Sequence, residues 1–345
     1  MENDEQEMLV IPNRQPQVRT SALSQDRHCE ELILEKTYES ASDFLKDVSY
    51  GGGVYGTMNR SIVYRGLKSG TYTLVPSVLR EKRKLTNPDG TVYVEDEKSP
   101  IKIVESELVQ RETEYYSLRC FFDICDSNGL KLPDVERIRK SLLSYRDLNA
   151  RRQFTDDWIP YDLLELTALA QHYGLKTRLL DWTSNIDTAI YFAIHEDPML
   201  SAEESKKPES QFIVIWMLDT GVEYKSKSLK FIRPQYWGNP NLCAQKGLFT
   251  YWKEPGFNVP SNIITEDELV KLHKVCINRS PLDMRLKEEL AGKRLDHSYM
   301  WKLRVPRADK KELWDYINKK GVNAASLFPG YAGVVRSINE AQNLK

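Results

Sequence analysis

The chain has 345 residues, 41% hydrophobic and 29% charged, so it can bury a core large enough to fold without disulfides or metal ions. Its 49 basic and 50 acidic residues leave a net charge of -1, which disfavours nucleic acid as a partner. The five cysteines lack zinc-ligand spacing, the acidic N-terminus lacks a secretory signal, and the longest apolar run (212–218) is too short for a membrane span. We therefore expect a cytoplasmic protein without a metal or a membrane contact.

Residues 1–30 are polar and aperiodic, which predicts a loose N-terminal arm, and we expect residues 31–345 to form a single domain. The segment SDFLKDVSY predicts a short helix with a serine cap at Ser42, and SIVYRG at 61–66 predicts a strand that ends at Gly66. Further along, the pattern predicts an exposed loop or hairpin at 80–100. It then predicts one helix at 101–126 and another at 133–148.

The middle of the chain carries the clearest patterns. Residues 160–174 predict a helix that stops at Gly174, and LKTRLLDW at 175–182 alternates as a strand does. Ser184 is followed three residues later by Asp187, a variant of the capping box that starts helices. The next helix is predicted by an apolar stripe with the spacing i, i+3, i+4, i+7, i+8: Ile186, Ala189, Ile190, Ala193 and Ile194.

The remaining segments alternate between strands and helices without the regular β-α-β order. A buried strand is predicted at 211–219, a further strand at 297–306, and a helix near 309–320. This order predicts an α+β fold with a split central sheet, mixed or antiparallel, flanked by helices.

Arg65 is the first candidate for ligand binding. It ends an apolar strand beside Gly66, and a glycine there lets a ligand or another backbone approach closely. A guanidinium fork suits a phosphate or a carboxylate. A structural salt bridge is the commoner use of such an arginine.

The second candidate segment is TRLLDWTSN at 177–185. Thr183 and Ser184 stand where a helix begins, beside free N–H groups that suit an anionic or amide-bearing ligand. Ser184 is also expected to cap that helix, so Thr183 or Trp182 would face the ligand. Arg178 and Asp181 lie three apart on the predicted strand and cannot pair directly.

Two further positions have both structural and functional interpretations. His172 and Tyr173 precede the helix-ending Gly174, where a histidine usually supports the helix end. Gln245 lies in an irregular or strand-like segment, and its amide could bind a substrate or fasten a loop. The local sequence does not separate these alternatives.

Together these segments resemble the FRG domain, a family named for a Phe-Arg-Gly signature that stands here as Tyr64-Arg65-Gly66. QHYGLKTRLLDWTSN with AIYFA, at 171–193, is similar to the family's more specific second motif, in which the lysine position is commonly proline. AQKGLF at 244–249 and SLFPGYAGV at 326–334 resemble weaker later patterns.

The order of the motifs is also similar to the Arg–Ser–Glu class of ADP-ribosyltransferases. This implies an ADP-ribosyltransferase-like fold with NAD as substrate, in which Arg65 holds the phosphates, Thr183 and Ser184 shape the nicotinamide site, and Gln245 takes the place of a late glutamate. The other residues implied in nucleotide binding are Tyr64, Gly66, His172, Tyr173, Arg178, Asp181 and Trp182. Glutamine lacks the negative charge that stabilises an oxocarbenium-like transition state, so Glu254 is a distant substitute.

These features leave three functional hypotheses. The first is an NAD-consuming transferase acting on a macromolecular target in bacterial antiphage or toxin-type defence, the setting that the resemblance implies. The second is a non-catalytic sensor that recognises a nucleotide or a phage protein through the same cleft, which the missing carboxylate favours. The third is a nucleic-acid-acting protein with stacking aromatic residues, which the near-neutral charge disfavours.

Overall fold

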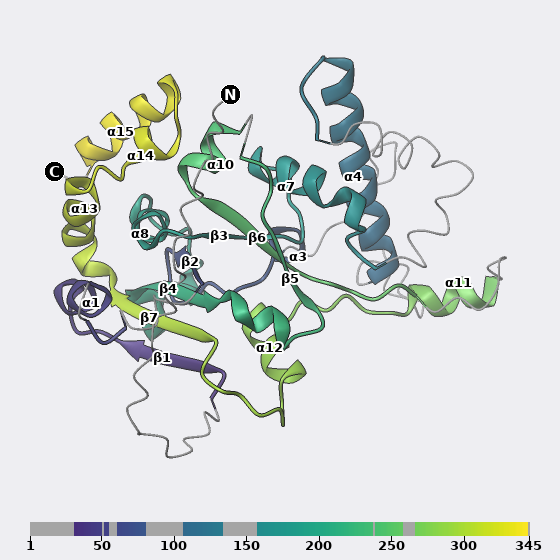
Figure 1. Cartoon of the computed structure of the whole chain (residues 1–345), viewed down its shortest axis with the longest axis horizontal. Coiled ribbons are helices and arrows are strands. Elements are labelled where there is room, and N and C mark those ends of the chain that lie inside the picture. Colours follow the sequence, from purple (N-terminus) through teal and green to yellow (C-terminus); the bar gives the residue numbers. More distant parts are fainter. Residues whose placement is uncertain are drawn as a thin grey trace, which may run out of the picture.

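A computed structural model of the chain describes residues 31–49, 52–54, 61–80, 106–133, 157–236, 239–257 and 266–343 (Figure 1). The predicted N-terminal arm at 1–30, the loop after Arg80 and the helix at 133–148 fall almost wholly outside these residues. No helix within the described ranges is long and apolar enough to cross a bilayer.

The described residues form an α+β fold around one seven-stranded mixed sheet, as predicted. The strand order is β1-β7-β4-β2-β3-β6-β5; β1 is parallel to β7, and every other neighbouring pair is antiparallel. The strands are β1 (Ile33–Thr37), β2 (Ile62–Leu67), β3 (Leu180–Thr183), β4 (Phe212–Asp219), β5 (Leu229–Ile232), β6 (Gly247–Trp252) and β7 (Met300–Pro306).

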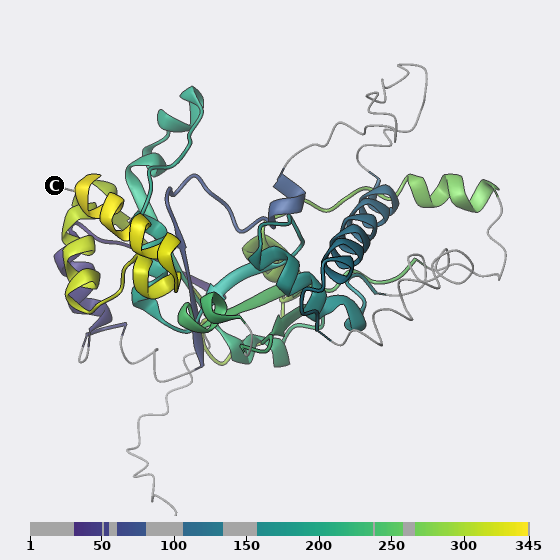
Figure 2. The same ribbon diagram turned by 90° about the horizontal axis from the view of Figure 1, so that it is seen from above.

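Helices cover both halves of the sheet (Figures 1 and 2). The α-helices are α1 (Ala41–Val48), α3 (Ser77–Arg80), α4 (Glu107–Ser127), α7 (Leu164–His172), α8 (Ile186–Ile194), α9 (Ala202–Ser205), α10 (Pro240–Ala244), α11 (Glu266–His273), α12 (Leu282–Glu289), α13 (Lys310–Lys319), α14 (Ala324–Leu327) and α15 (Tyr331–Asn343). The 3-10 helices are η3 (Tyr161–Leu163), η4 (Pro208–Gln211), η5 (Thr220–Tyr224) and η6 (Arg307–Asp309).

Three apolar clusters hold these layers together. Helices α1, α8 and α13 pack on β2, β4 and β7, while α4 and α7 pack against β5 and β6 in a second cluster. Helix α12 closes a third cluster with the central strands. The predicted stripe of α8 is confirmed, since Ala189, Ile190, Ala193 and Ile194 are all buried.

The sheet is weakest at the junction of its two halves. Strands β2 and β3 pair through Tyr64 and Thr183 alone, whereas β2 and β4 pair along their whole length from Ile62 to Leu67. Beyond that pair the two strands separate, so the sheet opens at the point where the two sequence motifs meet. We call this point the β2–β3 seam.

Several local details differ from the predictions for physical reasons. Helix α1 is capped by Ser40, not Ser42, because the Ser40 hydroxyl accepts from the Asp43 amide. Strand β3 begins only at Leu180, since the amide of Thr177 is tied to Ser77 and the carbonyl of Thr177 to Val78. The preceding residues 175–179 are therefore a connection, not a strand.

The start of α8 also differs from the predicted capping box. Its cap is Asn185, whose side-chain oxygen accepts from the Asp187 amide at 2.9 Å. The amide of Ser184 instead donates to the Lys246 carbonyl and joins β3 to the loop before β6.

Replacing Asn185 with alanine is expected to destabilise the protein by about 1 kcal/mol, because the cap is lost. Ser184→Ala is the matched control and should change stability by less than about 0.5 kcal/mol. Urea denaturation of both variants measures the difference. The opposite ranking would show that Ser184 caps α8.

Candidate functional site

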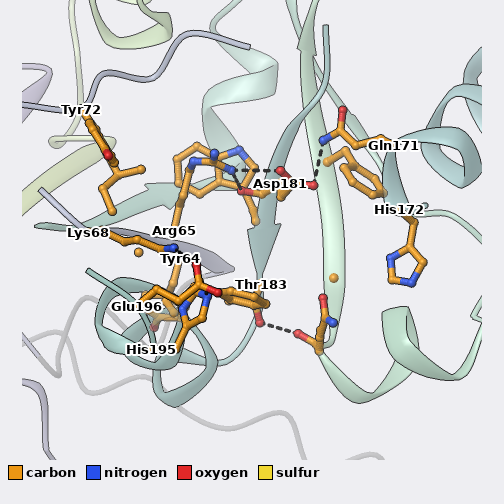
Figure 3. Close-up of a pocket in the computed structure, with 18 of the residues that line it drawn as sticks. Tyr64, Arg65, Lys68, Tyr72, Gln171, His172, Asp181, Thr183, His195 and Glu196 are labelled. Carbon is orange, nitrogen blue, oxygen red and sulfur yellow. Dashed lines mark hydrogen bonds and ion pairs between the residues drawn. The ribbon is translucent and has the colours of Figure 1, made fainter. Parts of the chain in front are cut away.

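A pocket of about 840 Å³ opens at the β2–β3 seam (Figure 3). Its walls come from β2, β3, β6, α8 and the ends of α7 and α10. A volume of this size is typical of small-molecule sites. The predicted site residues that line it are Tyr64, Arg65, Gly66, His172, Asp181, Trp182, Thr183 and Gln245.

Arg65 bridges the two strands where they separate. Its Nη1 donates to the main-chain carbonyl of Asp181 at 2.5 Å and lies 3.3 Å from the Asp181 carboxylate. The guanidinium thus replaces a hydrogen bond that a continuous strand pair would make. Its Nε is buried and has no hydrogen-bond partner among the described residues, so the guanidinium has one donor available for a ligand.

The carboxylate of Asp181 is held in place by the second motif itself (Figure 3). Gln171 at the end of α7 donates through Nε2 to Asp181 Oδ1 at 2.7 Å. The Thr177 hydroxyl in turn donates to Gln171 Oε1. The left-handed turn at Gly174, with φ of +98°, lets the chain fold back so that these side chains meet.

His172 lines the pocket from the same helix end. Burial lowers its pKa although Asp181 acts in the opposite direction, so the imidazole is neutral at neutral pH. It can therefore accept or donate one hydrogen bond without adding charge. Gln171 is a motif residue that the sequence did not single out.

Thr183 and Gln245 line the pocket but already have structural partners. The Thr183 hydroxyl donates to the Gln245 carbonyl at 2.7 Å and accepts from the Asn185 amide. The side-chain amide of Gln245 donates to the Leu327 carbonyl at 3.1 Å. Of the two interpretations of Gln245, the structure therefore favours the fastening of a loop.

Three predicted residues in the described part of the chain do not line the pocket: Tyr173, Arg178 and Ser184. Tyr173 and Ser184 are exposed elsewhere, and Arg178 is buried behind β3. Glu254, the distant substitute for the missing carboxylate, is outside the pocket as well, because it pairs with Arg285 at 2.6 Å.

Arg178 is the centre of a buried ion network with helix α4. Its Nη1 lies 2.9 Å from Glu107 and its Nε 2.9 Å from Glu114. Burial alone would lower the pKa of Arg178. The charges of Glu114 and Glu107 outweigh this effect, so the pKa is raised and the guanidinium stays charged. Because both acids are already engaged with Arg178, its role here is structural.

The opposite wall of the pocket carries a second charged group that the sequence did not indicate. Glu196, just after α8, lies 2.5 Å from Lys68 and 3.2 Å from Arg336 of α15. The hydrogen bond from Lys68 lowers the pKa of Glu196 and keeps it ionised. Burial lowers the pKa of the neighbouring His195 to about 4, so this histidine is neutral.

These additional residues share no recognisable sequence pattern. Lys68 and Tyr72 lie in the turn after β2, and Arg80 ends the four-residue helix α3. Glu196 could have been suspected only from its place two residues after the last residue of the α8 stripe. Only the fold brings them into one pocket with the two motifs.

Residues 60–201 match the model of the FRG domain, a range that includes Arg65 and the whole second motif. The later segments at 244–249 and 326–334 lie outside the matched range. No curated protein and no solved structure matches the chain. The two motifs of the matched range meet at the β2–β3 seam. The chain therefore contains an FRG domain over residues 60–201.

Proposed function

We propose that the pocket at the β2–β3 seam binds NAD and that the chain is an ADP-ribosyltransferase-like, NAD-consuming protein. The observation that carries this proposal is Arg65, whose guanidinium lines an 840 Å³ pocket and keeps a buried, unpartnered Nε. A buried donor without a partner is unfavourable unless a ligand atom accepts its hydrogen bond, and a phosphate oxygen is the natural acceptor for a guanidinium.

The chemistry would be a transfer at the ribose. The bond between the ribose C1′ and the nicotinamide nitrogen breaks, its electron pair leaves with neutral nicotinamide, and an acceptor oxygen or nitrogen bonds to C1′ and gives up a proton. The positive charge that develops on the ribose needs a nearby carboxylate. Asp181 and Glu196 both line the pocket, each in an ion pair, and are the two candidates for this carboxylate in place of Gln245.

The acceptor in this proposal is a macromolecule or water, and the setting is bacterial antiphage or toxin-type defence. Both come from the family resemblance. Consumption of NAD by such a protein would stop growth of the cell that makes it.

Purified protein incubated with NAD and cell lysate is expected to release nicotinamide or to label an acceptor. Arg65→Ala should reduce this activity at least about tenfold, because a charge-assisted hydrogen bond to phosphate contributes about 1.5–3 kcal/mol. The exposed Arg294 lies outside the pocket, and Arg294→Ala is the matched control. Turnover that survives unchanged in Arg65→Ala would contradict the proposal.

A non-catalytic nucleotide sensor is the second candidate. It is favoured by the structural partners of Thr183 and Gln245, which occupy the Thr183 hydroxyl and one donor of the Gln245 side-chain amide. Stabilisation of the protein by NAD without release of nicotinamide, lost in Arg65→Ala, would select this candidate.

A further inference from the structure

We infer that Arg80 is a second phosphate ligand of the pocket, so that the site selects a ligand with a diphosphate over one with a single phosphate. This deepens the proposed function and rests on it. The inference comes from the placement of Arg80 and from the charge balance around it.

Arg80 is fixed beside the seam by contacts to the segment that precedes β3. The amide of Val78 donates to the Thr177 carbonyl, and the Ser77 hydroxyl donates to the same oxygen at 3.3 Å. The Nε of Arg80 donates to the Val75 carbonyl at 2.8 Å. These bonds hold the guanidinium at the pocket wall without occupying its two Nη groups.

Arg65 and Arg80 line the same pocket. Partial burial lowers the pKa of Arg80, and the positive charge of Arg65 lowers it further, while Asp181 opposes both. Arg80 forms no ion pair with a carboxylate of the described residues, and Asp181 is already paired with Arg65. Among the described residues, the guanidinium groups of Arg65 and Arg80 therefore share the carboxylate of Asp181.

Two guanidinium groups on one pocket wall, one of them with an Nε that has no partner among the described residues, form an anion-binding arrangement. A single phosphate could satisfy one guanidinium fork. Two guanidinium groups on separate segments of one pocket can bind two linked phosphoryl groups, each of which accepts from one arginine. The pocket therefore suits the diphosphate of a dinucleotide or of a nucleoside diphosphate.

Calorimetric titration of the full chain with ADP-ribose and with AMP tests the inference, since these probes carry two phosphates and one. Arg80→Gln is expected to weaken ADP-ribose binding about tenfold or more and AMP binding less than about threefold. Arg80→Lys, which keeps the charge but not the fork, should give an intermediate loss for ADP-ribose. Thermal unfolding of each variant confirms that the fold is retained.

The outcomes separate this inference from the proposed function. If Arg65→Gln abolishes ADP-ribose binding while Arg80→Gln leaves it within twofold, the second-ligand role is wrong and the NAD site stands. Equal losses of ADP-ribose and AMP in Arg80→Gln overturn the diphosphate selectivity. If the unaltered protein binds neither probe, the proposed function itself fails. Arg294→Gln should match the unaltered protein throughout.

Discussion

Replacing Arg178 with alanine is expected to destabilise the protein by about 3–5 kcal/mol, because the change leaves the buried carboxylate of Glu114 without a charged partner and removes one of the two arginines that pair with Glu107. Glu107 and Glu114 are only 5% and 6% exposed, so water cannot replace the lost guanidinium. Arg111 would still pair with Glu107 at 2.7 Å, whereas Glu114 would keep only the neutral donors Gln110 and Trp158.

Chemical denaturation with tryptophan fluorescence as the probe measures this effect. The control is Lys46→Ala, which breaks an exposed pair with Asp43 on α1 and should cost less than about 0.5 kcal/mol. A variant Arg178→Ala that unfolds like the unaltered protein but no longer binds NAD would contradict the structural role. It would support the ligand-binding role that the resemblance implies.

Gly66→Ala is expected to destabilise the protein by about 3 kcal/mol, because an added methyl group would collide with the backbone of α8. Its Cβ would overlap the carbonyl oxygen of Ala189 and lie 2.9 Å from the amide nitrogen of Ala193. Backbone atoms of a buried helix cannot give way as a side chain can. Displacement of α8 should also weaken NAD binding, since Gly66 and Ala189 both line the pocket.

Gly321→Ala is the matched control for this change. Gly321 has a φ of +76° and an added Cβ would meet open space, so alanine there should cost about 1–2 kcal/mol through backbone strain alone. It should leave NAD binding unchanged. Equal stability losses in the two variants, with NAD binding intact in both, would contradict this explanation. They would show that Gly66 is not needed for the close packing of α8 on β2.

The sequence predicted those parts of the fold that depend on local periodicity. Strand β4 is apolar up to its last residue, helix α8 carries its apolar stripe at the predicted spacing, and Gly174 follows α7 as a left-handed residue. The prediction that another backbone segment approaches Gly66 closely is also confirmed, since the backbone of α8 lies against it. The resemblance joined IVYRG to the second motif, and the seam pair Tyr64–Thr183 is where they meet.

Other features could not be predicted because they depend on contacts between distant segments. The partners of Arg178 lie 71 and 64 residues earlier in the chain, on α4. The choice of Asn185 over Ser184 as a cap depends on the backbone leaving β3 one residue later than expected. Arg80 reaches the pocket only because α3 is tied to Thr177.

The measurement that tests the central claim most directly is a crystal structure of the protein with ADP-ribose. This ligand has the diphosphate of NAD but no nicotinamide, so the protein cannot cleave it by releasing nicotinamide. The diphosphate is expected to lie in the pocket at the β2–β3 seam, with a phosphate oxygen within hydrogen-bonding distance, about 3 Å, of the Arg65 guanidinium. ADP-ribose bound elsewhere on the protein, with Arg65 still facing only Asp181, would contradict this expectation.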